Sequence, residues 1–227
     1  MSDPRTLSEQ ALTTGDIADL LRDGVPVHLQ NCSFIGVDFA EADLAEWRFE
    51  KCDLRHANLD HCILEDVVFS GCRSVEASFR FARFSQVAFK DDDLSNTSFK
   101  HSQFADVAFE GCKMLGVDFT DTTTNELAFK KCNLGLSQMQ KITLRDATLT
   151  AVNFDQADLT CGDFRNALFD ECSLRESNVS EANFQGADLR NSDLGGLQMS
   201  DARRFKGAII SKRQAADLLG QLGLKVL

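Results

Sequence analysis

A hydrophobic side chain stands at every fifth position along most of this chain. The run begins at Leu29 and ends at Met199, without an inserted or deleted residue. Of its 35 positions, 33 carry Leu, Phe, Met or Val, and the exceptions are Ser74 and Thr124. A period of five fits neither the 3.6-residue turn of an α-helix nor the two-residue alternation of a flat strand. The chain is therefore expected to form a coil of stacked identical units.

Small residues fill a second frame, two positions before each member of the first. Seven of the eight cysteines fall in it, namely Cys32, Cys52, Cys62, Cys72, Cys112, Cys132 and Cys172. Free cysteine behaves as a compact hydrophobic residue. The sequence has no CxxC pair, and its four histidines show no zinc-ligand spacing with the cysteines. These cysteines are therefore predicted to be buried thiols that fill space, and no metal or cofactor is expected.

Identical residues recur every twenty positions, which is the length of four quintets. Phenylalanine shows this spacing at Phe49, Phe69, Phe89, Phe109 and Phe129. Residues that recur at this interval would stack on one side of a four-sided coil. The 35 quintets then make about nine coils, and a spacing of ~4.8 Å per coil gives a rod about 40 Å long. The sequence thus predicts one elongated all-β solenoid over residues 27–210.

Asp92 interrupts the column of cysteines that recurs every twenty residues. A local bulge at residues 91–93 would turn its carboxylate outward. Alternatively, Asp92 lies inside the rod, is hydrogen-bonded there and marks a bend. We expect the outward arrangement, because burying an unpaired carboxylate is costly.

Both ends of the chain depart from the repeat. Residues 1–26 are expected to form a cap with a helix over residues 16–23, which ends at Gly24. Near residue 201 the frame slips by one, which places Phe205 and Ile210 inward. Ser211 and Gln214 have the spacing of a capping box. A helix and tail are therefore expected over residues 211–227, and the apolar face of that helix carries Leu218, Leu219 and Leu222.

Composition and motifs argue against several classes of protein. The net charge of −11 disfavours direct binding of nucleic acid, which requires a basic surface. No leader-like segment and no run of 18 apolar residues is present, so the cytoplasm is the expected compartment and no membrane contact is expected. No catalytic motif occurs, and a convex rod with a filled interior offers no concave site. We do not expect an enzyme.

One outward column carries mostly acidic side chains. The column consists of Glu46, Asp66, Gln86, Asp106, Glu126, Asp146, Asn166 and Gly186. It is either a solvated corner, partly neutralised by Lys141, Arg145 and Arg165, or a line of charge that resembles a DNA phosphate strand and enters a basic groove. Phe81, in an outward position on the adjoining side, is either a contact residue or an incidental exposed side chain.

Several quintets resemble a known repeat. The segments EADLA (41–45), EANFQ (181–185) and GADLR (186–190) are similar to the A(D/N)LXX motif of pentapeptide-repeat proteins. That family winds four quintets into each turn of a right-handed quadrilateral β-helix. The segment CKMLGVDF (112–119) and the end of the chain from Lys206 are similar to the quinolone-resistance (Qnr-type) and albicidin-resistance members.

The resemblance implies a function as well as a fold. In those relatives the C-terminal helix pairs two rods end to end, and the rod imitates DNA against DNA gyrase. It implies here a homodimer through Leu218, Leu219 and Leu222, and gyrase or topoisomerase IV as partner. The body has no projecting loops, in which it is similar to the mycobacterial fluoroquinolone-resistance member. The alternative is a scaffolding module with another protein partner.

Overall fold

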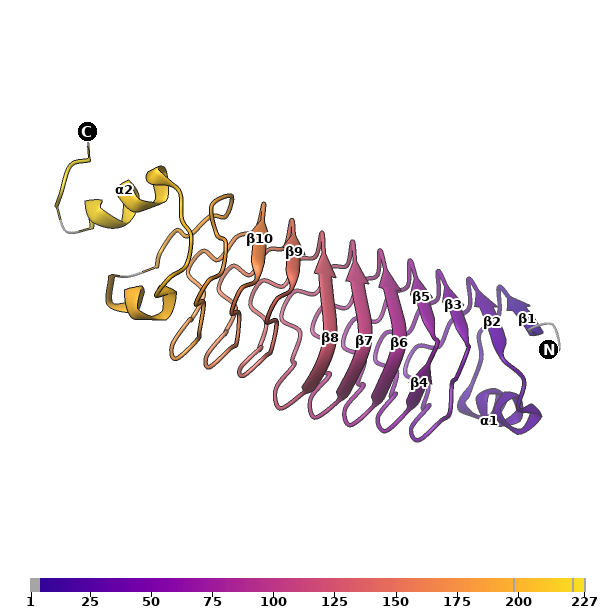
Figure 1. Ribbon diagram of the computed structural model, residues 1–227. Coiled ribbons are helices and arrows are strands. Elements are labelled where there is room, and N and C mark those ends of the chain that lie inside the picture. The colour runs from indigo at the N-terminus through magenta and orange to yellow at the C-terminus, as the bar shows by residue number, and fades with distance from the viewer. Residues whose placement is uncertain (1–4, 198, 222, 227) are drawn as a thin grey trace.

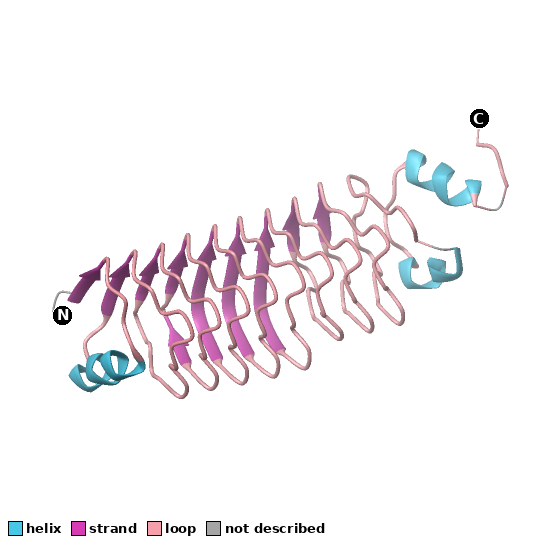
Figure 2. Ribbon diagram, turned by 180° about the vertical axis from the view of Figure 1, so that it is seen from behind, coloured by secondary structure: helices cyan, strands magenta, loops and turns pink. Residues whose placement is uncertain are grey.

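The computed structural model describes residues 5–197, 199–221 and 223–226. The protein is a right-handed quadrilateral β-helix, in which the coils follow one another along a single axis (Figure 1). One parallel sheet contains, in chain order, β1 (Arg5–Ser8), β2 (Val27–Gln30), β3 (Arg48–Glu50), β5 (Val68–Ser70), β6 (Arg83–Lys90), β7 (Gln103–Glu110), β8 (Thr123–Lys130), β9 (Thr148–Thr150) and β10 (Leu168–Asp170). A further strand, β4 (Ile63–Glu65), pairs with β6. The longest strands, β6, β7 and β8, lie side by side in the middle of the rod (Figure 2).

The coils are in register at intervals of twenty residues, as the sequence predicts. Phe69 pairs with Phe49 in the coil before it and with Phe89 in the coil after it. The rings of the column from Phe49 to Phe129 lie nearly parallel, with successive centroids 4.8, 4.7, 4.8 and 5.3 Å apart. Stacked rings of this kind fill the interior and exclude water, so each coil is stabilised mainly by its neighbours.

A left-handed backbone conformation forms each corner of the coil. The corner residue lies two places after each core side chain, as in Glu46, where φ is 63°. Its N–H donates to a carbonyl of the following coil, at 2.7 Å from Glu46 to Glu65. The side chain of a corner residue points away from the core. Corners are therefore the positions at which this fold displays side chains in regular columns.

The seven cysteines of the small-residue frame lie inside the rod, which confirms that part of the sequence analysis. The Cys62 thiol donates to the carbonyl of Phe39 at 3.0 Å. Burial raises the pKa of Cys62 to about 12, so this thiol stays protonated. The eighth cysteine, Cys161, is exposed at a corner.

Asp92 is buried, so the expectation that its carboxylate turns outward is wrong. The residue is only 2% exposed, and Asp93 keeps its register with Arg73 and Lys113, without a bulge. The Cys72 and Lys90 N–H groups donate to the two carboxylate oxygens at 2.5 and 3.0 Å. These two hydrogen bonds offset part of the cost of burial. The outward prediction had assumed that a buried carboxylate would have no hydrogen-bond partner.

The N-terminal segment contains more regular structure than expected. Helix α1 (Thr14–Asp23) begins after the N-cap Thr13 and ends at Gly24, close to the predicted bounds. The sequence analysis missed β1, which pairs with β2. Leu7 of β1 lies beside Leu29, so the interval here is 22 residues rather than twenty. Insertion of α1 lengthens this first, incomplete coil and hides it from a search for a fixed period.

The C-terminal end follows the predicted slip of one residue. Phe205, at the end of the 3₁₀ helix η1 (Met199–Phe205), stacks on Phe184 with 4.6 Å between ring centroids. Ile210 packs against the core. Helix α2 (Lys212–Gly220) begins with the capping box of Ser211 and Gln214. Leu222, the third apolar residue expected on this helix, lies outside the described residues.

One seam interrupts the hydrogen bonds between coils. Elsewhere each coil bonds to the next: the N–H groups of Leu144 and Asp146 donate to the carbonyls of Asp163 and Arg165 at 2.8 and 2.9 Å. Within the described residues, the equivalent N–H groups of Thr124 and Glu126 make no such bond to residues 143 and 145. Instead, the Thr124 hydroxyl donates to the Thr143 carbonyl at 3.3 Å. Thr124, one of the two exceptions in the hydrophobic frame, thus marks an opening between the first half of β8 and the segment that leads into β9, while Lys130 and Thr150 keep the two strands paired.

Candidate functional site

The acidic column predicted from the sequence occupies one corner of the rod. We call it the acidic corner, and it comprises Glu46, Asp66, Gln86, Asp106, Glu126, Asp146 and Asn166. All seven residues have positive φ and are exposed. Because consecutive members stand on consecutive coils, the side chains recur at about 4.8 Å along the rod. The repeat therefore arranges five carboxylates along one line.

Most of these carboxylates have no cationic partner. Within the described residues, only Asp146 of the five forms an ion pair, with Arg145 Nε at 3.3 Å. Asp146 also accepts a hydrogen bond from Asn166 Nδ2 at 2.9 Å. The guanidinium of Arg165, which the sequence analysis expected to help neutralise the column, binds Asp163, with Nε 2.8 Å from Oδ1, and also interacts electrostatically with Asp146. The column is thus paired at its C-terminal end, and at its N-terminal end the Arg48 guanidinium donates to the backbone carbonyls of Glu46 and Asp66 while their carboxylates form no ion pair within the described residues.

The seam between β8 and β9 cuts across the acidic corner. A hollow of about 460 Å³ lies there, and Asp106, Glu126, Arg145 and Asp146 are among the residues that line it. The column is therefore continuous from Glu46 to Glu126, and the backbone opens between Glu126 and Asp146. A partner that follows the corner would meet this hollow near its end.

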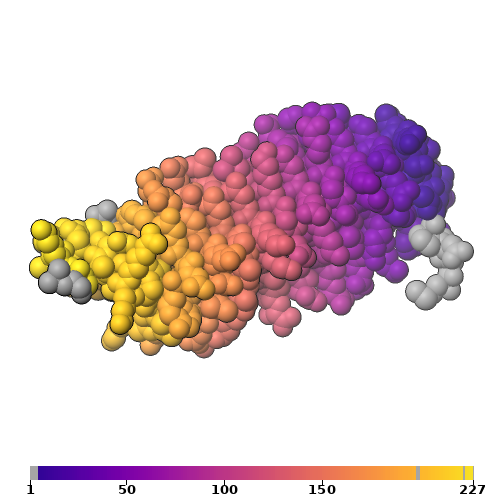
Figure 3. All heavy atoms as spheres, turned by 90° about the horizontal axis from the view of Figure 1, so that it is seen from above, coloured from indigo at the N-terminus to yellow at the C-terminus, as the bar shows by residue number. Residues whose placement is uncertain are grey.

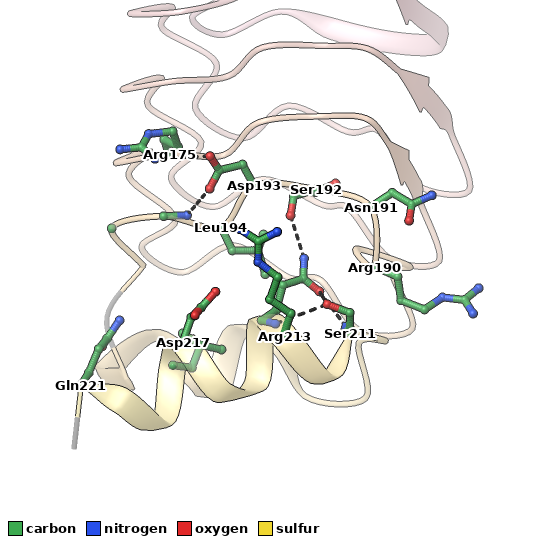
Figure 4. Close-up of a pocket in the computed structure, with 14 residues that line it drawn as sticks. Arg175, Arg190, Asn191, Ser192, Asp193, Leu194, Ser211, Arg213, Asp217 and Gln221 are labelled. Atoms are coloured by element: carbon green, nitrogen blue, oxygen red, sulfur yellow. Dashed lines mark hydrogen bonds and ion pairs between the residues drawn. The ribbon is translucent and has the colours of Figure 1, made fainter. Parts of the chain in front are cut away.

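A larger hollow of about 660 Å³ lies between the last coil and α2 (Figure 4). Arg175 and Asp193 face each other across its rim at 3.3 Å. The Gln214 side chain, which is buried, donates to the carbonyls of Leu189 and Ser192 at 2.7 Å. These contacts fix α2 on the end of the rod. The hollow is the gap where α2 packs against the last coil. Among its lining residues, no nucleophile lies beside a base.

The other side of α2 lines an apolar hollow of about 330 Å³. Leu218 and Leu219 form part of its wall, opposite Leu197 and Phe205 of the last coil and η1. Both leucines are half-buried. The structure therefore places these two predicted contact residues together at the end of the rod, beside an apolar surface that water covers in a single chain.

A stack of three rings on the next corner was missed by the sequence analysis, which placed Phe81 outward but did not connect it with the histidines. His61, Phe81 and His101 stand on consecutive coils, with ring centroids 4.9 and 4.8 Å apart. The interval of twenty residues that predicted the acidic corner also predicts this stack, because residues 61, 81 and 101 share one column.

Features of other kinds of site are missing from the described residues. No three His, Cys, Asp or Glu side chains are placed to hold a metal ion. Among those same residues, no helix is long and apolar enough to cross a membrane. The body of the rod is elongated, as the space-filling view shows (Figure 3). What the molecule offers a partner is its corners and its ends.

A family model for the pentapeptide repeat region matches residues 26–92, 82–142 and 125–199. The chain belongs to the pentapeptide-repeat family. No curated protein sequence matches it. Full-length QnrB1, a plasmid-mediated fluoroquinolone resistance protein, has a similar structure, with a TM-score of 0.55 at 20% identity over 97% of this chain and 98% of that one. At this identity the likeness shows the shared fold.

Two further structures show the breadth of this likeness. A trypsin-treated variant of QnrB1 gives a TM-score of 0.53 at 19% identity, over 99% of this chain and 98% of that one. HetL, a pentapeptide-repeat protein involved in heterocyst differentiation regulation in the cyanobacterium Nostoc, gives 0.42 at 19% identity, over 91% and 89%.

Proposed function

We propose that this pentapeptide-repeat protein binds a type II topoisomerase, DNA gyrase or topoisomerase IV, by imitating DNA, and that it modulates or protects that enzyme. The observation that carries the proposal is the acidic corner, in which Glu46, Asp66, Asp106 and Glu126 are exposed and form no ion pair within the described residues. A regular line of negative charge is what a groove built for duplex DNA attracts. The fold shared with a fluoroquinolone resistance protein is consistent with this proposal.

The proposal concerns binding and no chemical reaction. The interior is filled by stacked rings and thiols, and a partner can approach only the outer surface. Protection from a quinolone or a natural toxin would follow if the rod occupied the enzyme's DNA groove in place of the drug-trapped DNA. A scaffolding role, in which another protein reads one of the sides, is the second candidate. The stack of rings around Phe81 favours it.

We further propose that two chains pair end to end through α2. Leu218 and Leu219 lie beside the apolar hollow, and a second copy would cover this surface. Association of two chains is favoured because it removes exposed apolar surface of this kind from water. Such a dimer extends the acidic corner over two rods, which lengthens the imitated duplex.

A gyrase supercoiling assay tests the proposal. Purified gyrase and relaxed plasmid DNA would be incubated with a molar excess of this protein, with and without a quinolone. We expect slower supercoiling without the drug, or less drug-stabilised cleavage of DNA when the drug is present. If both readings stay unchanged with gyrase, and decatenation and drug-stabilised cleavage stay unchanged with topoisomerase IV, topoisomerase binding is wrong.

A further inference from the structure

The corner next to the acidic corner carries charge of the opposite sign. We call it the basic aromatic corner, and it comprises His61, Arg80, Phe81, Arg83, Lys100 and His101. Its backbone is fixed by the coil: the N–H groups of His61 and Phe81 donate to the carbonyls of Arg80 and Lys100 at 2.8 and 3.0 Å. Arg83 stands on the same side of the rod as Ile63 and Gln103, with which it is in register.

The three cations of this corner are free to bind a partner. Within the described residues, Arg80, Arg83 and Lys100 take part in no ion pair. Two carboxylates lie beside these cations: Asp60 accepts from the Arg80 backbone N–H at 2.8 Å, and Asp121 lies 3.8 Å from His101 Nδ1. Three unpaired cations close together are unusual on a chain whose net charge is −11.

Phe81 gives this corner a hydrophobic contact. Its side chain is 43% exposed, and its backbone has a φ of 59°, a conformation that a bulky residue adopts at a cost. The Arg80 guanidinium lies 5.7 Å from the ring centroid. An exposed aromatic ring beside arginine is typical of the residues that contribute most to protein–protein binding.

The stack also decides which class of partner fits. His61 and His101 cover the two faces of the Phe81 ring, with interplanar angles of 5° and 20°. Bases of single-stranded nucleic acid bind by stacking on exposed ring faces, and these faces are taken. The free edge of the ring carries positive partial charge, which suits a carboxylate or carbonyl oxygen.

Beside this corner the surface is hollowed and largely apolar. The hollow has a volume of about 440 Å³, and Ile63, Leu64, Arg83, Phe84 and Phe104 are among its lining residues. Ile63 is 40% exposed. The surface therefore offers cations and an aromatic edge along one margin and an apolar floor next to it.

From these features we infer that the basic aromatic corner is a docking site for an acidic segment of another protein, which places carboxylates on Arg80, Arg83 and Lys100 and an apolar side chain in the hollow beside Phe81. The site is separate from the acidic corner and does not depend on a topoisomerase partner. It gives the rod two surfaces of opposite charge on neighbouring corners, so one chain can hold two different partners.

Binding of a fluorescein-labelled peptide of four Glu-Glu-Leu repeats, followed by fluorescence anisotropy in low salt, tests this inference. We expect saturable binding by the wild type. The variant R80A/R83A/K100A should bind at least about tenfold more weakly, because it loses the three cations that would hold the carboxylates of the peptide. The control variant K90A/K130A/K131A has the same net charge and should bind within about twofold of the wild type.

Phe81→Asn provides a second variant whose fold is secure, since Asn31, Asn96 and Asn166 adopt the same backbone conformation at other corners. We expect it to weaken peptide binding by about threefold or more, through loss of the ring. The inference is overturned if the wild type does not bind the peptide or if the triple variant binds like the control. It is also overturned if a twelve-residue oligothymidine binds more tightly than the peptide, or if sedimentation shows that a second copy of this chain occupies the corner.

Discussion

At the scale of single residues, Asp92 is the most unusual group of the interior. It replaces one cysteine of a stacked column and is held by two backbone N–H donors. Burial nevertheless raises the pKa of Asp92 to about 7. The unfolded chain releases this proton near pH 4, whereas the folded protein keeps it until about pH 7. The folded state therefore binds more protons in that window, and the free energy of unfolding falls as the pH rises through it.

Replacing Asp92 with cysteine should remove this pH dependence. Cysteine fills the equivalent positions at Cys72 and Cys112, so Asp92→Cys is expected to preserve the packing. The free energy of unfolding of the variant minus that of the wild type is predicted to rise by up to about 4 kcal/mol between pH 4 and pH 7. Above pH 7 this difference should stay constant. Urea unfolding at pH 5, 6, 7 and 8 measures it. A difference that does not change with pH would show that Asp92 is ionised throughout.

At the scale of secondary-structure elements, the seam between β8 and β9 sets local stability. The N–H groups of Thr124, Glu126 and Thr143 have no backbone acceptor in the adjacent coil, within the residues described. Those of Leu144, Asp146 and Asp163, one coil further on, bond at 2.8, 2.9 and 2.9 Å. Backbone groups without such bonds open more easily than their paired neighbours.

Hydrogen exchange should resolve the seam residue by residue. We predict that the amides of Thr124, Glu126 and Thr143 exchange at least about tenfold faster than the matched amides of Leu144, Asp146 and Asp163, because no coil-to-coil bond protects them. Exchange followed by NMR gives both sets in one experiment. Equal protection of the two sets would mean that the ladder between coils is closed in solution.

Sequence periodicity predicts the elements that obey the repeat and fails where another element intervenes. It places the phenylalanine column, the buried cysteines and the corners, because each follows from an interval of five or twenty. The interval cannot reveal β1, since the insertion of α1 separates the paired residues Leu7 and Leu29 by 22 positions instead of twenty. For Asp92, composition alone could not show that two N–H donors converge on the carboxylate. The ring stack of the basic aromatic corner could have been predicted, since His61, Phe81 and His101 recur at the interval of twenty.

At the scale of the whole molecule, function depends on how the rod is extended and what its corners display. The interior is filled from end to end, so partners meet only outer columns and the two ends. The acidic corner and the basic aromatic corner run along neighbouring edges of one side. Rods that join end to end through α2 would add a second acidic corner beyond the end of a single chain.

End-to-end pairing makes a clear prediction for Leu218. A carboxylate introduced by Leu218→Asp would lie in the apolar hollow beside Leu219 and Phe205, where an unpaired charge is costly to bury. We predict that the wild type sediments as a dimer and this variant as a monomer. Leu224→Asp is the control, since Leu224 is 55% exposed, and it should remain dimeric. Dimers of the Leu218 variant would show that another surface pairs the chains.

The most direct test of the central claim is a comparison of two charge reversals in the supercoiling assay. The first variant changes Asp66, Asp106 and Glu126 of the acidic corner to Lys, and the control changes Glu76, Glu171 and Glu176 on other corners. The net charges of the two variants are equal, and Lys51, Lys131 and Lys141 already adopt the corner conformation, so both should fold. We predict that the control keeps the effect of the wild type on gyrase and that the first variant loses at least about tenfold in potency. Equal potency of the two variants would contradict the claim that gyrase reads the acidic corner.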